Sequence, residues 1–158
     1  MNKVYLLTGG NIGNRKQNLQ QAALLLEQFG TIEQKSGLYQ TAAWGKTDQP
    51  AFLNQVLLLH TTLSPTLLLE KVLATELTMG RMRMEKYGPR IIDIDILFYN
   101  DEVIDLPALT VPHPQLPNRR FVLAPLNEIA PHLVHPVLHK TISQLLEECP
   151  DELEVVRI

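Results

Sequence analysis

The chain contains little cysteine, few aromatic residues and only a small excess of charge. Cys149 is the only cysteine among 158 residues, so an intramolecular disulfide is excluded. The formal net charge of -3 and the pI of about 5.9 lack the broad positive field of a nucleic-acid-binding surface. Neither a long apolar run nor the apolar segment of a leader peptide is present, so we expect a cytoplasmic protein with no membrane partner.

The remaining composition is that of a compact globular enzyme. Hydrophobic residues make up 45% of the chain and charged residues 20%, which is ordinary for a soluble protein. A chain of 158 residues is of single-domain size and can bury a core. We therefore expect residues 1–158 to form one catalytic domain, and we expect a monomer.

Hydrophobic periodicity predicts strands and helices in alternation. Short apolar runs predict strands at residues 3–8, 31–41, 51–62 and 91–98, and helical spacing predicts helices over 14–29 and 65–80. Ser64 and Pro65 are typical of a helix start. The order βαββαβ is that of an α+β ferredoxin-like sandwich with an antiparallel sheet. A C-terminal extension follows, with a proline-rich stretch and a short helix near Thr141 that begins in a capping box.

One segment joins clustered cations to paired carboxylates. Asp93 and Asp95 are two residues apart on an apolar strand, so both side chains point to one face. Two like charges there are costly unless a cation lies between them, and Mg2+ is the natural candidate. A metal beside clustered guanidinium groups suits a polyphosphate, although a structural salt bridge is the alternative. The cations just upstream are Arg81, Arg83, Lys86 and Arg90.

Several motifs are spaced over nearly the whole chain. They are Trp44-Gly45 with residues 48–54, Gly80-Arg-Met-Arg83, residues 87–95, residues 109–113, Asn118-Arg119 and Phe121. The combination G-P-R-x-x-D-x-D-I, followed by T-V-P-H at residues 110–113, is more specific than either part. Together these motifs resemble the 6-hydroxymethyl-7,8-dihydropterin pyrophosphokinase family of folate biosynthesis.

The resemblance implies an ATP-dependent diphosphotransferase. Such an enzyme transfers the β,γ-pyrophosphoryl unit of ATP to the pterin hydroxymethyl group and releases AMP, so its partners are ATP and the pterin. The resemblance assigns a pair of Mg2+ ions to Asp93 and Asp95, and catalytic roles to these two residues together with Arg83 and Arg90. No side chain is an obvious strong base, so positioning and electrostatics should carry most of the rate.

The resemblance also implies two sets of substrate contacts. Phe52 and Asn54 share one strand face, which would bring together an aromatic wall and an amide that reads the pterin edge, although core packing and a sheet-edge cap are the alternatives. The implied pterin residues are Thr41, Ala43, Trp44, Phe52, Asn54 and Phe121. The implied nucleotide residues are Glu76, Arg81, Arg83, Tyr87, Arg90, Ile96, Thr110, His113 and Arg119.

Departures from the family pattern and one alternative function remain. Family members commonly carry serine where Gly10 stands and prolines where Ala42 and Ala43 stand. A ferredoxin-like sheet is also the fold of RNA-recognition domains, which would require exposed aromatic residues on the first and third strands and a basic face. Tyr5 and Phe52 could supply those aromatic residues, but the acidic pI opposes this alternative.

Overall fold

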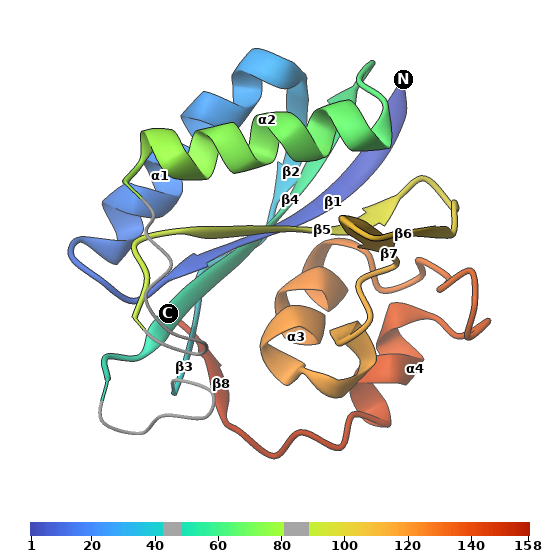
Figure 1. Ribbon diagram of the computed structural model, residues 1–158. Helices are drawn as coiled ribbons and strands as arrows, with labels where there is room; N and C mark the ends of the chain where they lie inside the picture. Colours follow the sequence, from blue (N-terminus) through green and yellow to red (C-terminus); the bar gives the residue numbers. More distant parts are fainter. Residues whose placement is uncertain (43–48, 81–88) are drawn as a thin grey trace.

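The computed structural model describes residues 1–42, 49–80 and 89–158 (Figure 1). The described chain has an α+β architecture built on an antiparallel sheet, as expected. Its helices are α1 (Arg15–Leu26), α2 (Pro65–Thr78), α3 (Arg120–Ile129) and α4 (Ile142–Glu147), with short 3-10 turns at Glu27–Phe29 and Leu116–Asn118. Its strands are β1 (Asn2–Gly10), β2 (Thr31–Lys35), β3 (Tyr39–Thr41), β4 (Phe52–Thr61), β5 (Asp93–Tyr99), β6 (Ile104–Leu106), β7 (Leu109–Val111) and β8 (Val155–Arg157).

The main sheet has the order β5-β1-β4-β3-β8, and β2 also pairs with β4. Strand β1 is central and pairs antiparallel with β4 along its whole length, from Asn2 to Gly10. The strand expected over residues 31–41 is divided in two. At the break, the Ser36 backbone N–H donates to Val56 O, and Ser36 Oγ accepts from Val56 N, each at 2.9 Å. This side chain replaces a backbone acceptor and separates β2 from β3.

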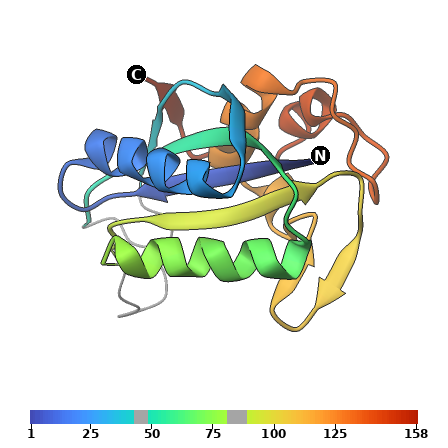
Figure 2. The same cartoon turned by 90° about the horizontal axis from the view of Figure 1, so that it is seen from above.

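Helices cover both faces of the sheet (Figures 1 and 2). Helices α1 and α2 lie on one face over a buried cluster that includes Leu6, Leu19 and Leu68. Helices α3 and α4 lie against the other face, over a second cluster that includes Leu7 and Leu123. Leu6 and Leu7 are adjacent on β1 and belong to different clusters because successive side chains of a strand point to opposite faces.

The starts of two helices follow the chemistry expected from the sequence. Ser64 Oγ accepts a hydrogen bond from Leu67 N at 3.3 Å, with Pro65 as the first helical residue. Thr141 and Gln144 form the capping box of α4, each side chain bonded to the other residue's backbone N–H. The first helix is shorter than expected, because its last residues tighten into a 3-10 turn after Leu26.

Helix α3 and the β6–β7 hairpin were not expected from the sequence. The prolines of this region argue against a helix, although Val122, Leu123 and Leu126 have helical spacing. All three are buried. Pro125 lies inside α3, where it removes one backbone hydrogen bond. Its burial with the other apolar residues of α3 offsets that loss, because tertiary packing outweighs local propensity.

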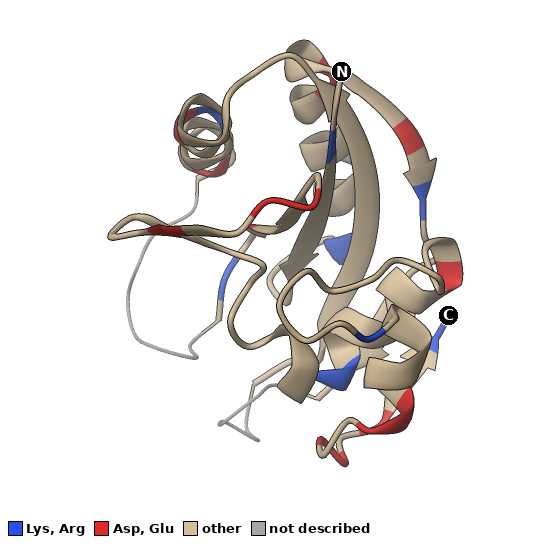
Figure 3. Ribbon diagram, turned by 90° about the vertical axis from the view of Figure 1, so that its right-hand side faces the viewer, with Lys and Arg blue, Asp and Glu red and all other residues tan. Residues whose placement is uncertain are grey.

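Charged residues are dispersed over several elements of the described chain (Figure 3). Tyr5 of β1 packs edge-on against Phe98, with ring centroids 6.4 Å apart, beneath the layer of α3 and α4. The exposed strand aromatics required by the RNA-recognition alternative are therefore not available at Tyr5. None of the helices in the described ranges is long and apolar enough to span a membrane.

Candidate active site

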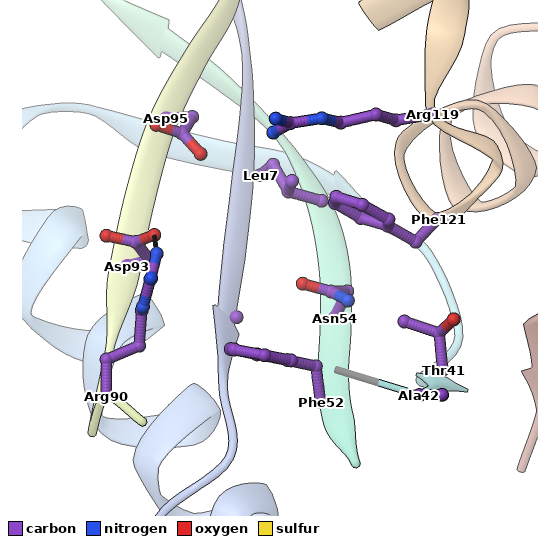
Figure 4. A pocket seen from close by; sticks show the side chains of 11 residues that line it. Leu7, Thr41, Ala42, Phe52, Asn54, Arg90, Asp93, Asp95, Arg119 and Phe121 are labelled. Carbon is purple, nitrogen blue, oxygen red and sulfur yellow. Dashed lines mark hydrogen bonds and ion pairs between the residues drawn. The ribbon is translucent and has the colours of Figure 1, made fainter. Parts of the chain in front are cut away.

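A pocket opens where β1, β4 and β5 extend beyond the layer of α3 and α4 (Figure 4). It encloses about 590 Å³ of empty space, open solvent at its mouth included. Its walls combine two aromatic rings, an amide, two carboxylates and two guanidinium groups. The lining residues are Leu7, Gly9, Thr41, Ala42, Phe52, Asn54, Arg90, Asp93, Asp95, Arg119 and Phe121.

Strand register arranges these side chains in rows. Gly9 of β1 pairs with Asp93 of β5 on one side and with Asn54 of β4 on the other. In the neighbouring row, Leu7 pairs with Asp95. Gly9 keeps its row open, because a Cβ at this position would lie 2.1 Å from Asn54 Oδ1. The absence of this one side chain lets the amide of Asn54 extend over β1.

The two aspartates line the pocket from one face of β5, as their spacing predicts (Figure 4). Arg90 Nη1 donates to Asp93 Oδ2 at 2.6 Å. Burial first, and then the charges of Asp93 and Glu76, raise the pKa of Asp95 to about 7, while Arg119 and Arg90 oppose this shift. Among the described residues, burial and the neighbouring carboxylates thus disfavour the charged form of Asp95, and a bound cation would offset that cost.

Arg119 lines the pocket with the aspartates, and His113 lies close enough for its pKa to respond to Arg119 and Asp93. In Figure 4 the guanidinium of Arg119 extends toward Asp95. Burial and the charge of Arg119 lower the pKa of His113, with Asp93 opposing them, which favours the neutral imidazole. His113 Nδ1 accepts a hydrogen bond from Gln115 N at 3.2 Å. The neutral ring therefore carries its proton on Nε2, which leaves Nε2–H as a donor.

Two aromatic rings lie on either side of Asn54 in the view of Figure 4. The Arg90 Cζ atom lies 5.7 Å from the ring centroid of Phe52, and Arg119 Cζ lies 5.7 Å from that of Phe121. Both separations are within the range of cation–π attraction, so each ring also orients a guanidinium. This Phe–Asn–Phe arrangement offers two apolar surfaces and one amide to a flat, polar-edged molecule.

Asn11 hydrogen-bonds to both chain segments beside the end of β1, the one before β4 and the one before β5. Its side chain is buried, and its Nδ2 donates to Gln49 Oε1 at 2.8 Å and to Pro50 O at 3.0 Å. Its Oδ1 accepts from Arg90 N at 2.9 Å, and its own N–H donates to Arg90 O at 3.0 Å. The backbone on which Arg90 stands is thus fixed to the end of β1.

Gly10 makes this close approach possible. A Cβ at Gly10 would lie 2.4 Å from Ile91 O and 3.0 Å from Ile91 C, both backbone atoms that cannot rotate away. The glycine that departs from the common family pattern is therefore required by the path of residues 90–91 in this chain.

Four described residues implied as nucleotide contacts lie outside the pocket lining, and His113 is one of them. Glu76 is buried on α2, and its Oε2 accepts from Ile94 N at 2.8 Å, between the two aspartates. Ile96 is buried in the cluster beneath α1 and α2, so only its backbone could meet a ligand on the other face. Thr110 is exposed on β7. Five further implied residues, Ala43, Trp44, Arg81, Arg83 and Tyr87, lie outside the described ranges.

Three lining residues, Leu7, Gly9 and Ala42, are not among the site residues expected from the sequence, where Ala42 appears only as a departure from the family pattern. For Leu7 and Gly9 the available signal was their two-residue spacing at the end of the first strand. Within the described ranges, no group of three or more His, Cys, Asp or Glu side chains is placed to hold a metal ion. The aspartate pair still fits Mg2+, which commonly takes one or two protein carboxylates and fills its remaining positions with water and phosphate oxygens.

Comparison with known proteins identifies the family. Residues 5–131 match the sequence model described as 7,8-dihydro-6-hydroxymethylpterin-pyrophosphokinase (HPPK). The chain is 45% identical over 148 residues to the 2-amino-4-hydroxy-6-hydroxymethyldihydropteridine pyrophosphokinase of Aquifex aeolicus, covering 94% of this chain and 92% of that protein. It is 46% identical to the Synechocystis protein of the same name, covering 89% of this chain and 72% of that protein.

A solved structure shares the fold. The wild-type HPPK-DHPS of Plasmodium falciparum, crystallised with SDX-DHP, superposes with a TM-score of 0.76 over 94% of this chain, at 21% identity. This chain spans only 43% of that longer protein. With the fold shared and most of its length matched, the chain belongs to the 7,8-dihydro-6-hydroxymethylpterin-pyrophosphokinase family.

Proposed function

We propose that the pocket is the place where this chain transfers the pyrophosphoryl group of ATP to 6-hydroxymethyl-7,8-dihydropterin. As a member of its family, the chain is an ATP-dependent pyrophosphokinase of folate biosynthesis. One observation carries the assignment to this pocket: a Phe–Asn–Phe arrangement suited to a flat ring lies in the same cavity as an aspartate pair with two guanidinium groups.

The pterin ring lies between Phe52 and Phe121, and its guanidine-like edge faces Asn54. An amide offers both a donor and an acceptor, so Asn54 can make paired hydrogen bonds to that edge. Thr41 supports this side of the pocket, since its hydroxyl donates to Glu154 O at 3.1 Å and fixes the end of β3. This arrangement directs the hydroxymethyl group toward the aspartates of β5. Ala43 and Trp44, outside the described ranges, belong to the same proposal.

The triphosphate lies on the side of Asp93 and Asp95. These carboxylates would hold Mg2+, which neutralises phosphate charge and activates the attacking hydroxyl when bound. Arg90 and Arg119 supply guanidinium groups that can bind phosphate oxygens, and His113 offers its Nε2–H as a neutral donor. The remaining proposed nucleotide contacts are Glu76, Arg81, Arg83, Tyr87, Ile96 and Thr110, with Arg83 also proposed as catalytic.

Catalysis then rests on alignment and electrostatics. The pterin hydroxyl oxygen attacks the β-phosphorus and forms a bond to it, and the hydroxyl proton is released to water. The bond from the β-phosphorus to the oxygen of the AMP leaving group breaks. Asp93 and Asp95 orient the attacking hydroxyl, while Arg90 and Arg119 stabilise charge on the phosphoryl oxygens. Phe52 and Phe121 exclude water from the reacting hydroxyl, which limits hydrolysis of ATP.

Finer features of the molecule complete the proposal. A ferredoxin-like core is supported by the strand order β5-β1-β4, with β2 and β3 together taking the position of the second strand. The α3–α4 layer is then the C-terminal extension of a single domain, residues 1–158. A monomer in the cytoplasm, binding neither nucleic acid nor membrane, remains the expectation from the sequence.

The direct test is the identity of the nucleotide product. The chain is incubated with ATP, Mg2+ and reduced hydroxymethylpterin, and nucleotides are separated by chromatography. AMP and pterin diphosphate in equal amounts are expected, with neither formed when the pterin is omitted. Formation of ADP would refute the proposed reaction. Asp95→Asn, which removes a charge from the proposed phosphate side without changing side-chain shape, serves as the matched inactive control.

A further inference from the structure

The first turn of α3 presents alternate residues to the pocket and to the C-terminal segment. Arg119 and Phe121 line the pocket, whereas Arg120, between them, reaches the segment that follows α4. Arg120 Nε donates to Asp151 O at 3.1 Å, and Arg120 Nη2 donates to Cys149 O at 3.4 Å. The positions of Arg119 and Phe121 therefore depend on the hydrogen bonds that join this turn to the C-terminal segment.

Asp151 holds this turn through the backbone. Its Oδ2 accepts from Arg120 N at 3.1 Å, and its Oδ1 accepts from Leu153 N at 3.0 Å. Arg119 is the N-cap of α3 and provides no side-chain cap, so the carboxylate of Asp151 replaces the missing cap from a distant part of the sequence. Asp151 is only 7% exposed, which protects these hydrogen bonds from competing water.

The same segment also contacts the opposite wall of the pocket. Thr41 donates to Glu154 O, and β8 pairs with β3 from Val155 to Arg157. In Figure 1 this red segment runs beneath α3 from α4 to β8. Residues 149–155 thus connect the wall that carries Phe121 with the wall that carries Thr41, and they lie beyond residues 5–131 matched by the family model.

We propose that Asp151 is a positioning residue for pterin binding: by capping α3 it fixes Phe121, and Arg119 beside it, at the pocket. The inference rests on the proposed function. A purely structural residue would alter pterin affinity whether or not Phe121 is present. The proposed role of Asp151 instead requires the ring of Phe121.

A double-mutant cycle measures that dependence. Pterin Kd is determined by fluorescence titration with 6-hydroxymethylpterin, in the presence of Mg2+ and a non-hydrolysable ATP analogue, for wild type, Asp151→Ala, Phe121→Ala and the double variant. Asp151→Ala should raise the pterin Kd on the order of tenfold, since an orphaned amide lets the turn shift. In the Phe121→Ala background the same substitution should change Kd less than about twofold, because no ring remains to be positioned.

Two further variants separate positioning from loss of fold. Glu152→Ala removes an exposed acidic side chain next to Asp151 and should match wild type in pterin Kd and melting temperature. Asp151→Asn keeps one acceptor oxygen for Arg120 N and should recover part of the lost affinity. If Asp151→Ala does not fold, the cycle is run with Asp151→Asn, where a smaller rise in Kd that vanishes without the Phe121 ring is expected.

Each result has a single meaning. Unchanged pterin Kd in the Asp151 variants, or an equal rise in Kd with and without the Phe121 ring, would overturn the positioning role. A wild-type chain that does not bind pterin would instead refute the proposed function, and with it this inference.

Discussion

Replacing Gly9 with alanine tests whether Asn54 reads the pterin. A Cβ at this position would lie 2.1 Å from Asn54 Oδ1, closer than real Cβ contacts come, and a tight 3.1 Å from its Cγ. The next neighbour, Leu53 O, lies at an ordinary 3.4 Å. Only the end of the Asn54 side chain therefore has to move, so we expect the amide to rotate away from β1 and lose its alignment with the ring edge.

The expected magnitude follows from the hydrogen bonds lost. A buried polar group left without its partner costs about 1–3 kcal/mol, which corresponds to a rise in pterin Kd of roughly 5- to 150-fold. Folding should be affected far less. Gly9 is not among the positive-φ glycines of the described chain, so alanine fits the backbone, and it favours a strand by roughly 0.5–1 kcal/mol over glycine.

The measurement is calorimetric titration of Gly9→Ala with 6-hydroxymethylpterin and, separately, with a non-hydrolysable ATP analogue. Pterin affinity should fall while affinity for the ATP analogue remains within about twofold of wild type. Asn54→Ala provides the matched background, because it removes the oxygen that the new methyl group would meet. Gly9→Ala should therefore have no further effect in the double variant. The proposed link between Gly9 and Asn54 would be refuted if Gly9→Ala bound pterin as tightly as wild type. It would also be refuted if Gly9→Ala weakened pterin binding equally in the wild-type and Asn54→Ala chains.

Three other outcomes are expected. Asp95→Asn should fold normally but lower single-turnover rates by orders of magnitude, since it removes a negative ligand from the proposed Mg2+ site; near-normal turnover would contradict that site. Glu76→Ala should lower the free energy of unfolding in urea by about 1–3 kcal/mol by orphaning Ile94 N, whereas Glu76→Gln keeps an acceptor and should lose less. Burial and the hydrogen bond to Glu128 raise the pKa of Tyr39 to about 12, so its stabilising contribution is complete below pH 10 and is lost as pH rises toward 12. The difference in urea midpoint between wild type and Tyr39→Phe should therefore shrink over that range, and a constant difference would contradict the linkage.

Local patterns predicted the parts of the fold that depend on local chemistry. The two-residue period of a strand is enough to place Asp93 with Asp95, and Phe52 with Asn54, on one face. Ser64 with Pro65, and Thr141 with Gln144, marked helix starts because caps are made by neighbours in sequence. These predictions succeeded because few residues and short distances decide them.

The features that were missed depend on contacts between distant residues. Helix α3 forms despite Pro125 because its apolar residues pack against α4 and the sheet, which no local propensity reports. The significance of Gly9 appears only once β1 is in register between β4 and β5. The role of Asp151 likewise requires α3 and the C-terminal segment to meet, which the sequence separation of 31 residues conceals.

The buried cluster beneath α3 and α4 and the pocket lie on the same face of the sheet. Leu7 belongs to the cluster beneath α3 and α4 and also lines the pocket, and two residues farther along β1 lies Gly9. On β5, Leu97 is buried in that cluster, and two residues back is Asp95. A slip of one residue between the strands would turn both the apolar and the catalytic sets to the wrong face. The packing of Leu7 and Leu97 therefore fixes the register that brings Asp95, Asp93 and Asn54 into one cavity, so stability of the core and geometry of the site are selected together.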